Sequence, residues 1–191
     1  MSEQVPLTTT PLPYRLTVDD FFRLDAAGAF KGYGKTELIR GEVFYMNAQH
    51  RPHARMKGLV YQALLKSLAE LDTGLDVLIE ATVSMPPHSA PEPDLILTSE
   101  PDGEGPVPIG SVRLLVEIAD STQKNDLELK AGLYAANGVP EYWVVDLKRK
   151  RVHQMWSPGE VEYRERRELA LGEKIEAATI NCLNIDVNSP Y

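Results

Sequence analysis

The chain has 191 residues, a formal net charge of −8 and one cysteine, Cys182. This length favours one domain, and one cysteine excludes an internal disulfide or a multi-cysteine metal site. No apolar run approaches the ~20 residues that span a bilayer, and the N-terminal residues do not resemble a signal peptide, so we expect a cytoplasmic protein. The acidic charge counts mildly against a nucleic-acid partner, although the run KRKR at 148–151 is basic.

The N-terminal part predicts an arm followed by a helix. Residues 1–16 are rich in proline and threonine, which predicts an extended arm, and residues 17–191 are expected to form the single domain. Thr17 suits the N-cap of a helix over 17–29, because Asp20 stands three residues later in a near capping box.

A hairpin and a long helix are expected next. The β-prone runs TELIR and EVFYMN meet at Arg40-Gly41, which predicts a hairpin. From His53, apolar residues recur with helical spacing, which predicts an amphipathic helix over 53–71. Alternating apolar residues over 77–85 then predict a strand.

The second half alternates strands with one helix. The run DLILT, opened by Asp94, and the run VRLLVEIAD read as buried strands. A short helix is expected from Asn125 to a stop at Gly138. The runs PEYWVVDL and RVHQMW predict two more strands. This order indicates an α/β domain with a central mixed β-sheet flanked by helices, preceded by an N-terminal helix and hairpin.

Three charged residues stand on neighbouring predicted elements. Asp94 opens one predicted strand, Glu117 lies inside the next, and Lys130 follows on the adjacent helix. An ionised carboxylate in a dry strand is costly unless it is paired or bound to a metal. Carboxylates from neighbouring strands can hold a divalent cation, and a nearby ammonium can stabilise a phosphate. The set predicts phosphodiester hydrolysis.

The same residues carry a family resemblance. The run PEPD, followed by VEIADSTQKNDLELKAGLYAANGVPEYWVVD, resembles the PD-(D/E)XK nuclease superfamily. Within it, TELIRGEV, HARMKGLVYQALLKSL and GVPEYWVVD are similar to elements of the Uma-two family of restriction-endonuclease-like proteins. The resemblance covers roughly residues 15–160, with the elements in the family's order.

This resemblance implies a restriction-endonuclease-like fold and an endonuclease that hydrolyses DNA with Mg²⁺ or Mn²⁺. Asp94 and Glu117 match the acidic metal ligands, and we add the backbone carbonyl of Ile118 as a third. Lys130 matches the lysine that assists water attack. The resemblance also implies a homodimer, because cleavage of two strands in this superfamily commonly uses two subunits. No membrane partner is expected.

The chain departs from the superfamily pattern at one position. A lysine is expected two residues after Glu117, where Ala119 stands, and Lys130 on the next helix takes its place. Glu37 matches an N-terminal glutamate of the family and is included in the predicted catalytic set. Its neighbour Glu42 competes for that role, and His53 is open to a structural or a functional reading.

Two other functions stay open at this point. The first is a catalytically inactive scaffold with a nuclease fold that binds nucleic acid or a protein, which the acidic charge and Ala119 favour. The second is hydrolysis of a nucleotide or another small phosphodiester. The residues taken singly also have structural readings: Glu117 in a salt bridge with Lys130 or Arg113, and Lys130 paired with Asp126 on the helix surface.

Overall fold

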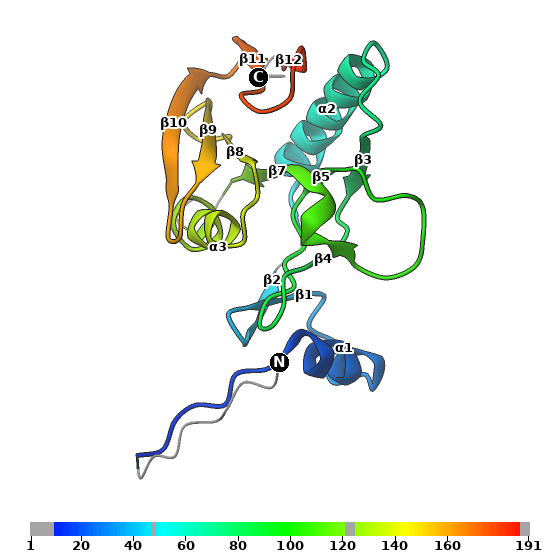
Figure 1. The fold of residues 1–191 in the computed structure, drawn as a ribbon, viewed down its shortest axis with the longest axis vertical. Helices are drawn as coiled ribbons and strands as arrows, with labels where there is room; N and C mark the ends of the chain where they lie inside the picture. Colours follow the sequence, from blue (N-terminus) through cyan, green and yellow to red (C-terminus); the bar gives the residue numbers. More distant parts are fainter. Residues whose placement is uncertain (1–9, 47–48, 121–124, 188–191) are drawn as a thin grey trace.

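A computed structural model of the chain describes residues 10–46, 49–120 and 125–187. Six strands form a central mixed sheet: β3 (Asp76–Ile79), β5 (Leu95–Thr98), β7 (Val112–Ala119), β8 (Glu141–Asp146), β9 (Arg151–Pro158) and β10 (Tyr163–Ala170). Their order across the sheet is β10-β9-β8-β7-β5-β3 (Figure 1). Neighbours are antiparallel except for β7 and β8, which are parallel.

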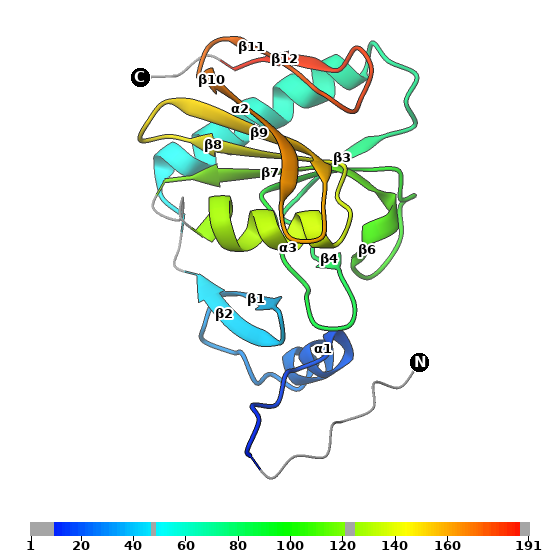
Figure 2. The same cartoon turned by 60° about the vertical axis from the view of Figure 1, so that its left-hand side comes forward.

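The parallel pair requires a crossover connection, since parallel neighbours cannot be joined by a tight turn. The crossover contains a π-helical turn (Asn125–Lys130) and α3 (Ala131–Ala136), and Gly138 then takes a positive φ of 74°. It covers one face of the sheet, while α2 (Arg51–Leu68) covers the other (Figure 2). The predicted α/β architecture, with a central mixed sheet between helices, is confirmed.

The two faces of β7 belong to two different hydrophobic cores. Leu114, Val116 and Ile118 pack in the core beneath α2. Leu115 and Ala119 pack in the core beneath α3. Because side chains alternate along a strand, Glu117 belongs to the α3 face, where it stands among buried apolar residues. This explains why β7 reads as a nearly continuous apolar run, as strands buried on both faces do.

The N-terminal helix and the hairpin form a smaller layer beside the sheet (Figure 2). They are α1 (Val18–Ala26), β1 (Lys35–Ile39) and β2 (Glu42–Met46). The capping box at Thr17 and Asp20 is confirmed, and the helix ends before Gly28, which has a φ of 79°. Residues 1–9 of the predicted arm lie outside the described residues. Leu16 N–H donates to the carbonyl of Gly41 at 3.1 Å, so the arm's end is held on the hairpin.

The predicted continuous strand over 77–85 is wrong. β3 ends at Ile79, and Glu80 adopts a left-handed φ of 52°. The chain then forms the short strand β4 (Val83–Ser84), which pairs in parallel with β6 (Val107–Pro108) ahead of a 3₁₀ turn at Ile109–Ser111. Val83 and Met85, which follow the break, are also buried. The apolar alternation in the sequence therefore continues through the break. The alternation therefore could not reveal where the strand ends.

The C-terminal segment is held over α2 by a buried carboxylate that stands apart from the predicted site. β11 (Lys174–Glu176) and β12 (Asn184–Asp186) pair antiparallel. Glu141, fully buried on β8, accepts hydrogen bonds from Trp143 Nε1 at 2.6 Å and from the N–H of Thr179 at 2.8 Å. A buried carboxylate is tolerated when several donors satisfy it, so Glu141 joins the last hairpin to the sheet.

No helix among the described residues is long and apolar enough to cross a bilayer.

Candidate active site

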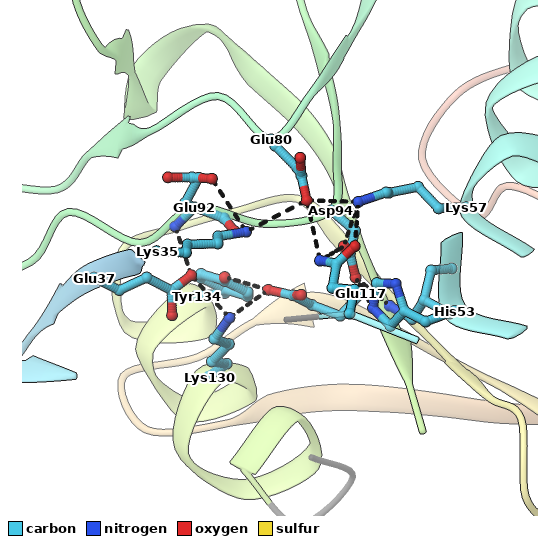
Figure 3. A network of polar contacts seen from close by, with 12 residues as sticks. Lys35, Glu37, His53, Lys57, Glu80, Glu92, Asp94, Glu117, Lys130 and Tyr134 are labelled. Atoms are coloured by element: carbon cyan, nitrogen blue, oxygen red, sulfur yellow. Dashed lines mark hydrogen bonds and ion pairs between the residues drawn. The ribbon is translucent and has the colours of Figure 1, made fainter. Parts of the chain in front are cut away.

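The structure brings the predicted charged residues to one end of the sheet. Asp94 immediately precedes β5, Glu117 lies on β7, Lys130 ends the π-helical turn and Glu37 comes from β1. Figure 3 shows these side chains converging with His53 at the start of α2. The residues come from five separate elements, so their meeting is a product of tertiary structure.

Lys130 is the centre of the first group of contacts. Its Nζ lies 2.8 Å from Glu117 Oε1 and 3.1 Å from Glu37 Oε1. Tyr134, one turn further along, donates its hydroxyl to the same Glu117 oxygen at 3.1 Å. All four side chains are buried. The ammonium is thus held between two carboxylates in a dry environment.

The local backbone explains why Lys130 faces inward. The turn before α3 is π-helical, and its residues Asp126 and Lys130, four apart, are both buried. Wider turns of this kind frequently occur at functional sites. The hydroxyl of Tyr142 donates to the carbonyl of Asp126 at 3.1 Å, which ties the turn to β8. The reading of Lys130 as a solvated helix residue is therefore wrong, and its pairing with Glu117 is confirmed.

Asp94 forms the second group of contacts. Its Oδ2 accepts the N–H of Ile118 at 2.8 Å and lies 3.1 Å from His53 Nε2. Its Oδ1 accepts from Gln49 Nε2 at 3.2 Å and lies 3.4 Å from Lys57 Nζ. The bond to Ile118 joins Asp94 to the residue directly after Glu117, which links the two groups. No described contact joins Asp94 to Lys130 directly.

Two residues that the sequence reasoning missed extend the site. Lys57 Nζ lies 2.6 Å from Glu80 Oε1 and 2.7 Å from Gln49 Oε1. Lys57 follows His53 by four residues, so both lie on the same face of α2, and this spacing could have identified it. Glu80 had no comparable signal, because its position depends on the break after β3. Figure 3 shows Lys57 and Lys130 approaching the acids from different elements.

Of the two hairpin glutamates, only one reaches the site. Glu37 is 2% exposed and also accepts the N–H of Glu92 at 2.8 Å, whereas Glu42 is exposed. The catalytic roles assigned to Asp94, Glu117, Lys130 and Glu37 stay predictions.

The pKa values of Glu117 and Asp94 shift in opposite directions. Burial raises the pKa of Glu117 to about 8; Lys130 opposes this rise, while Asp126, Asp94 and Glu37 add to it. Burial also raises the pKa of Asp94, but the hydrogen bond and charge of His53, the Ile118 N–H and Lys57 together bring it below its usual value. Asp94 is therefore ionised at neutral pH, whereas Glu117 holds a proton more readily.

Burial lowers the pKa of Lys130, but Glu117, Glu37 and Asp126 outweigh it and raise that pKa above its usual value. Lys130 therefore remains an ammonium ion at any pH near neutrality. A group that stays charged can attract a phosphate, but it cannot accept a proton from water. Its chemistry is restricted to positioning and charge stabilisation.

The available oxygens fit a hard divalent cation. Glu117 Oε2 accepts no hydrogen bond from a described residue, so its lone pairs are available. Asp94 is more fully occupied, and Lys57, its longest contact at 3.4 Å, is the one a cation would displace most easily. The Ile118 N–H faces Asp94, and its carbonyl lies on the same side of the strand as that N–H. Mg²⁺ is commonly held by one or two carboxylates together with water and substrate phosphate.

A cage built only from protein side chains is not present. Among the described residues, no three or more His, Cys, Asp or Glu side chains form a group that could hold a metal ion. Two carboxylates and a backbone carbonyl suit magnesium better than zinc, which prefers nitrogen and sulfur ligands.

Similarity to known proteins extends over most of the chain. A family model described as "Uma2: Putative restriction endonuclease" matches residues 18–188. A crystal structure described as a "putative nuclease belonging to DUF820 from Anabaena variabilis" is similar, with a TM-score of 0.62 and 15% sequence identity. The similarity covers 85% of this chain and 89% of that chain. No curated protein matches.

At 15% identity, the structural likeness shows the fold alone, and this confirms the predicted restriction-endonuclease-like fold. The family match extends over most of the chain and includes the hairpin, α2 and every strand of the central sheet. The chain therefore belongs to the Uma2 family, whose model is described as a putative restriction endonuclease.

Proposed function

We propose that the protein is a magnesium-dependent endonuclease that hydrolyses phosphodiester bonds of DNA. The observation that carries the proposal is one buried group of charged side chains. Lys130 Nζ lies 2.8 Å from Glu117, and the N–H of the next residue, Ile118, donates to Asp94. Two acids and an ammonium gathered at a sheet end are the parts that metal-assisted phosphoryl hydrolysis requires. The family to which the chain belongs supports DNA as the substrate.

Each residue has a distinct part in the proposed reaction. Asp94, Glu117 and the carbonyl of Ile118 would hold the metal, which supplies a Lewis acid and lowers the pKa of bound water. Lys130 orients the attacking water and stabilises the negative charge that grows on the phosphate. Glu37 holds Lys130 in place, and His53 orients Asp94 through its 3.1 Å contact.

Several wider predictions belong to the same proposal. Mn²⁺ is expected to replace Mg²⁺, because both are hard cations that accept oxygen ligands. A homodimer is expected by analogy, because cleavage of two strands in the PD-(D/E)XK superfamily commonly uses two subunits. A cytoplasmic location and a single domain over residues 17–191 also stay predictions.

The first test is metal-dependent cleavage by the full chain. Supercoiled plasmid DNA is incubated with the purified protein and Mg²⁺, Mn²⁺, Ca²⁺ or a chelator. We expect nicked and linear products with Mg²⁺ or Mn²⁺ and none with the chelator, read on a gel over time. If the DNA remains intact with every cation, although circular dichroism shows that the protein is folded, the hydrolytic proposal is wrong.

One observation favours a non-cutting scaffold as the second candidate. Glu117 and Glu37 share Lys130, and Asp94 and Glu80 share Lys57, so the acids are already neutralised by lysines. In an inactive protein these ion pairs would simply stabilise the fold. Isothermal titration separates the candidates, since a scaffold would bind DNA equally well with and without Mg²⁺ and would not bind the metal itself.

The affinity for Mg²⁺ is expected to rise with pH. The pKa of Glu117 is raised by burial to about 8, so below that pH a cation must displace a proton from the carboxyl. The dissociation constant should therefore fall about tenfold for each pH unit between 6 and 8 and level off above 8. Isothermal titration at pH 6.5, 7.5, 8.5 and 9.5 measures this. An affinity that is constant across the series would contradict Glu117 as a ligand.

A further inference from the structure

Two surface cavities border opposite ends of α2. The first, about 280 Å³, touches Pro52 and Met56 near the start of the helix. The second, about 420 Å³, touches Lys66 and Glu70 at its other end. Neither cavity is lined by the side chains of the candidate active site. They provide a natural comparison because they share one helix and differ in chemistry.

The first cavity lies at the edge of the sheet where β7 and β8 end, on the face that α2 covers, whereas Glu117 points to the α3 face. It is lined by Asp120, which directly follows β7, and by Leu147 and Lys148, which directly follow β8. The two strands are parallel, so both reach the same edge of the sheet. Crevices outside the carboxyl ends of parallel strands are preferred ligand sites in α/β proteins. Asp120 is three residues beyond Glu117, and Pro52 directly precedes His53, so two elements of the site also build the cavity.

The turn that borders the cavity is held in a defined conformation. Asp146, buried at the end of β8, accepts the backbone N–H of Arg149 at 3.0 Å and its guanidinium at 3.2 Å. The N–H of Leu147 donates to the carbonyl of Ala119 at 3.0 Å, which joins the turn to β7. Lys150 has a left-handed φ of 52°. These contacts position Lys148 and Lys150 at the cavity without help from a ligand.

The lining combines an apolar surface with positive charge. Pro52, Met56, Leu147 and Leu171 supply apolar surface, and Lys148 and Lys150 supply two cations on a chain of net charge −8. This combination complements a ligand with a flat apolar part and a phosphate. Asp120 adds an acceptor that could take a hydrogen bond from a base amino group. The second cavity differs, because Glu70 and Asp186 offset Lys66 there.

We propose that the first cavity binds one nucleotide of the DNA substrate next to the bond that is cut. The base packs against the apolar surface, and Lys148 and Lys150 contact its phosphate. At about 280 Å³ the cavity is at the low end of small-ligand sites, which suits one unstacked nucleotide rather than a stretch of duplex. This inference rests on the proposed nuclease function and names a substrate contact that the catalytic residues do not provide.

Binding of deoxynucleoside 5′-monophosphates to the full chain, with a chelator present, tests this inference separately from catalysis. The four monophosphates, thymidine and inorganic phosphate are titrated by NMR. We expect at least one monophosphate to bind more tightly than phosphate or thymidine and to shift the amide signals of Asp120 and Leu147. Replacing both lysines (Lys148→Ala with Lys150→Ala) should weaken this binding at least fivefold. Lys66→Ala, at the second cavity, should not change it.

Three outcomes would overturn the inference. The first is no binding of any monophosphate, and the second is equal affinity for phosphate alone, which would indicate a simple anion site. The third is unchanged affinity in a Leu171→Trp variant that fills the cavity and retains the wild-type melting temperature. Failure of the nuclease proposal has a different signature, since monophosphate binding would persist in a protein that never cuts DNA.

Discussion

Replacing Asp94 by Asn or Glu117 by Gln is expected to lower metal-stimulated DNA cleavage by more than about a hundredfold. Loss of a group that only supports a metal ligand typically costs 10–100-fold, and these two residues are the proposed ligands themselves. Both substitutions keep the size of the side chain and remove its charge. Cleavage rates at saturating Mg²⁺, together with Mg²⁺ affinity by titration calorimetry, measure the effect.

The Glu117→Gln variant should lose activity without losing stability. In this variant Lys130 keeps its second carboxylate partner, Glu37 Oε1 at 3.1 Å, so the ammonium is not left without a counter-charge in the buried site. The variant's melting temperature at pH 7 should therefore stay close to that of the wild type. Glu42→Gln is the matched control, because Glu42 is exposed and lies on the hairpin that carries Glu37. Wild-type cleavage by both Asp94→Asn and Glu117→Gln would rule out the proposed metal site.

Replacing Lys130 by Met is expected to abolish cleavage and to destabilise the fold by about 3–5 kcal/mol, the usual cost of removing one partner from a buried ion pair. Without the ammonium, Glu117 and Glu37 would face each other in a dry environment with no cation between them. Chemical denaturation at pH 7 measures the stability change. Lys66→Met, at an exposed position on α2, should leave both stability and cleavage unchanged.

A second substitution separates the structural from the catalytic role of Lys130. Combining Lys130→Met with Glu37→Gln removes one acid together with the ammonium and should recover most of the lost stability. The recovered double variant should still fail to cut DNA, because no cation remains to stabilise charge on the phosphate. If the double variant cuts DNA at the wild-type rate, Lys130 has only a structural role.

The burial of β7 on both faces explains why the sequence predicted so much of the fold. Strands covered on both sides need continuous apolar runs, and VRLLVEIA is such a run. The apolar stripe of α2 and the capping box at Thr17 are equally local signals. Both helices formed, although α2 begins at Arg51 and ends at Leu68 and α1 ends at Ala26, short of the predicted ends. The break after Ile79 was missed because apolar alternation continues through it.

The charged residues could be selected from the sequence because acids and lysines are rare in buried elements. Asp94, Glu117, Lys130 and Glu37 were all identified in this way or by family resemblance. The Glu117–Lys130 pair was one of the sequence readings, and the spacing from His53 points to Lys57. The acids that Lys57 meets could not be identified, since Glu80 is 23 residues away and Asp94 is 37. Contacts of that kind depend on how α2 lies across the ends of β3 and β5.

Local patterning thus determined which segments become helices or strands and which charged side chains are costly to bury. Only the packed structure decided that Glu37 rather than Glu42 reaches Lys130, that His53 and Lys57 contact Asp94, and that a cavity opens beside β7 and β8. The reason is physical: hydrogen-bonding patterns and side-chain periodicity act over a few residues, whereas ion pairs and cavities arise where distant elements meet.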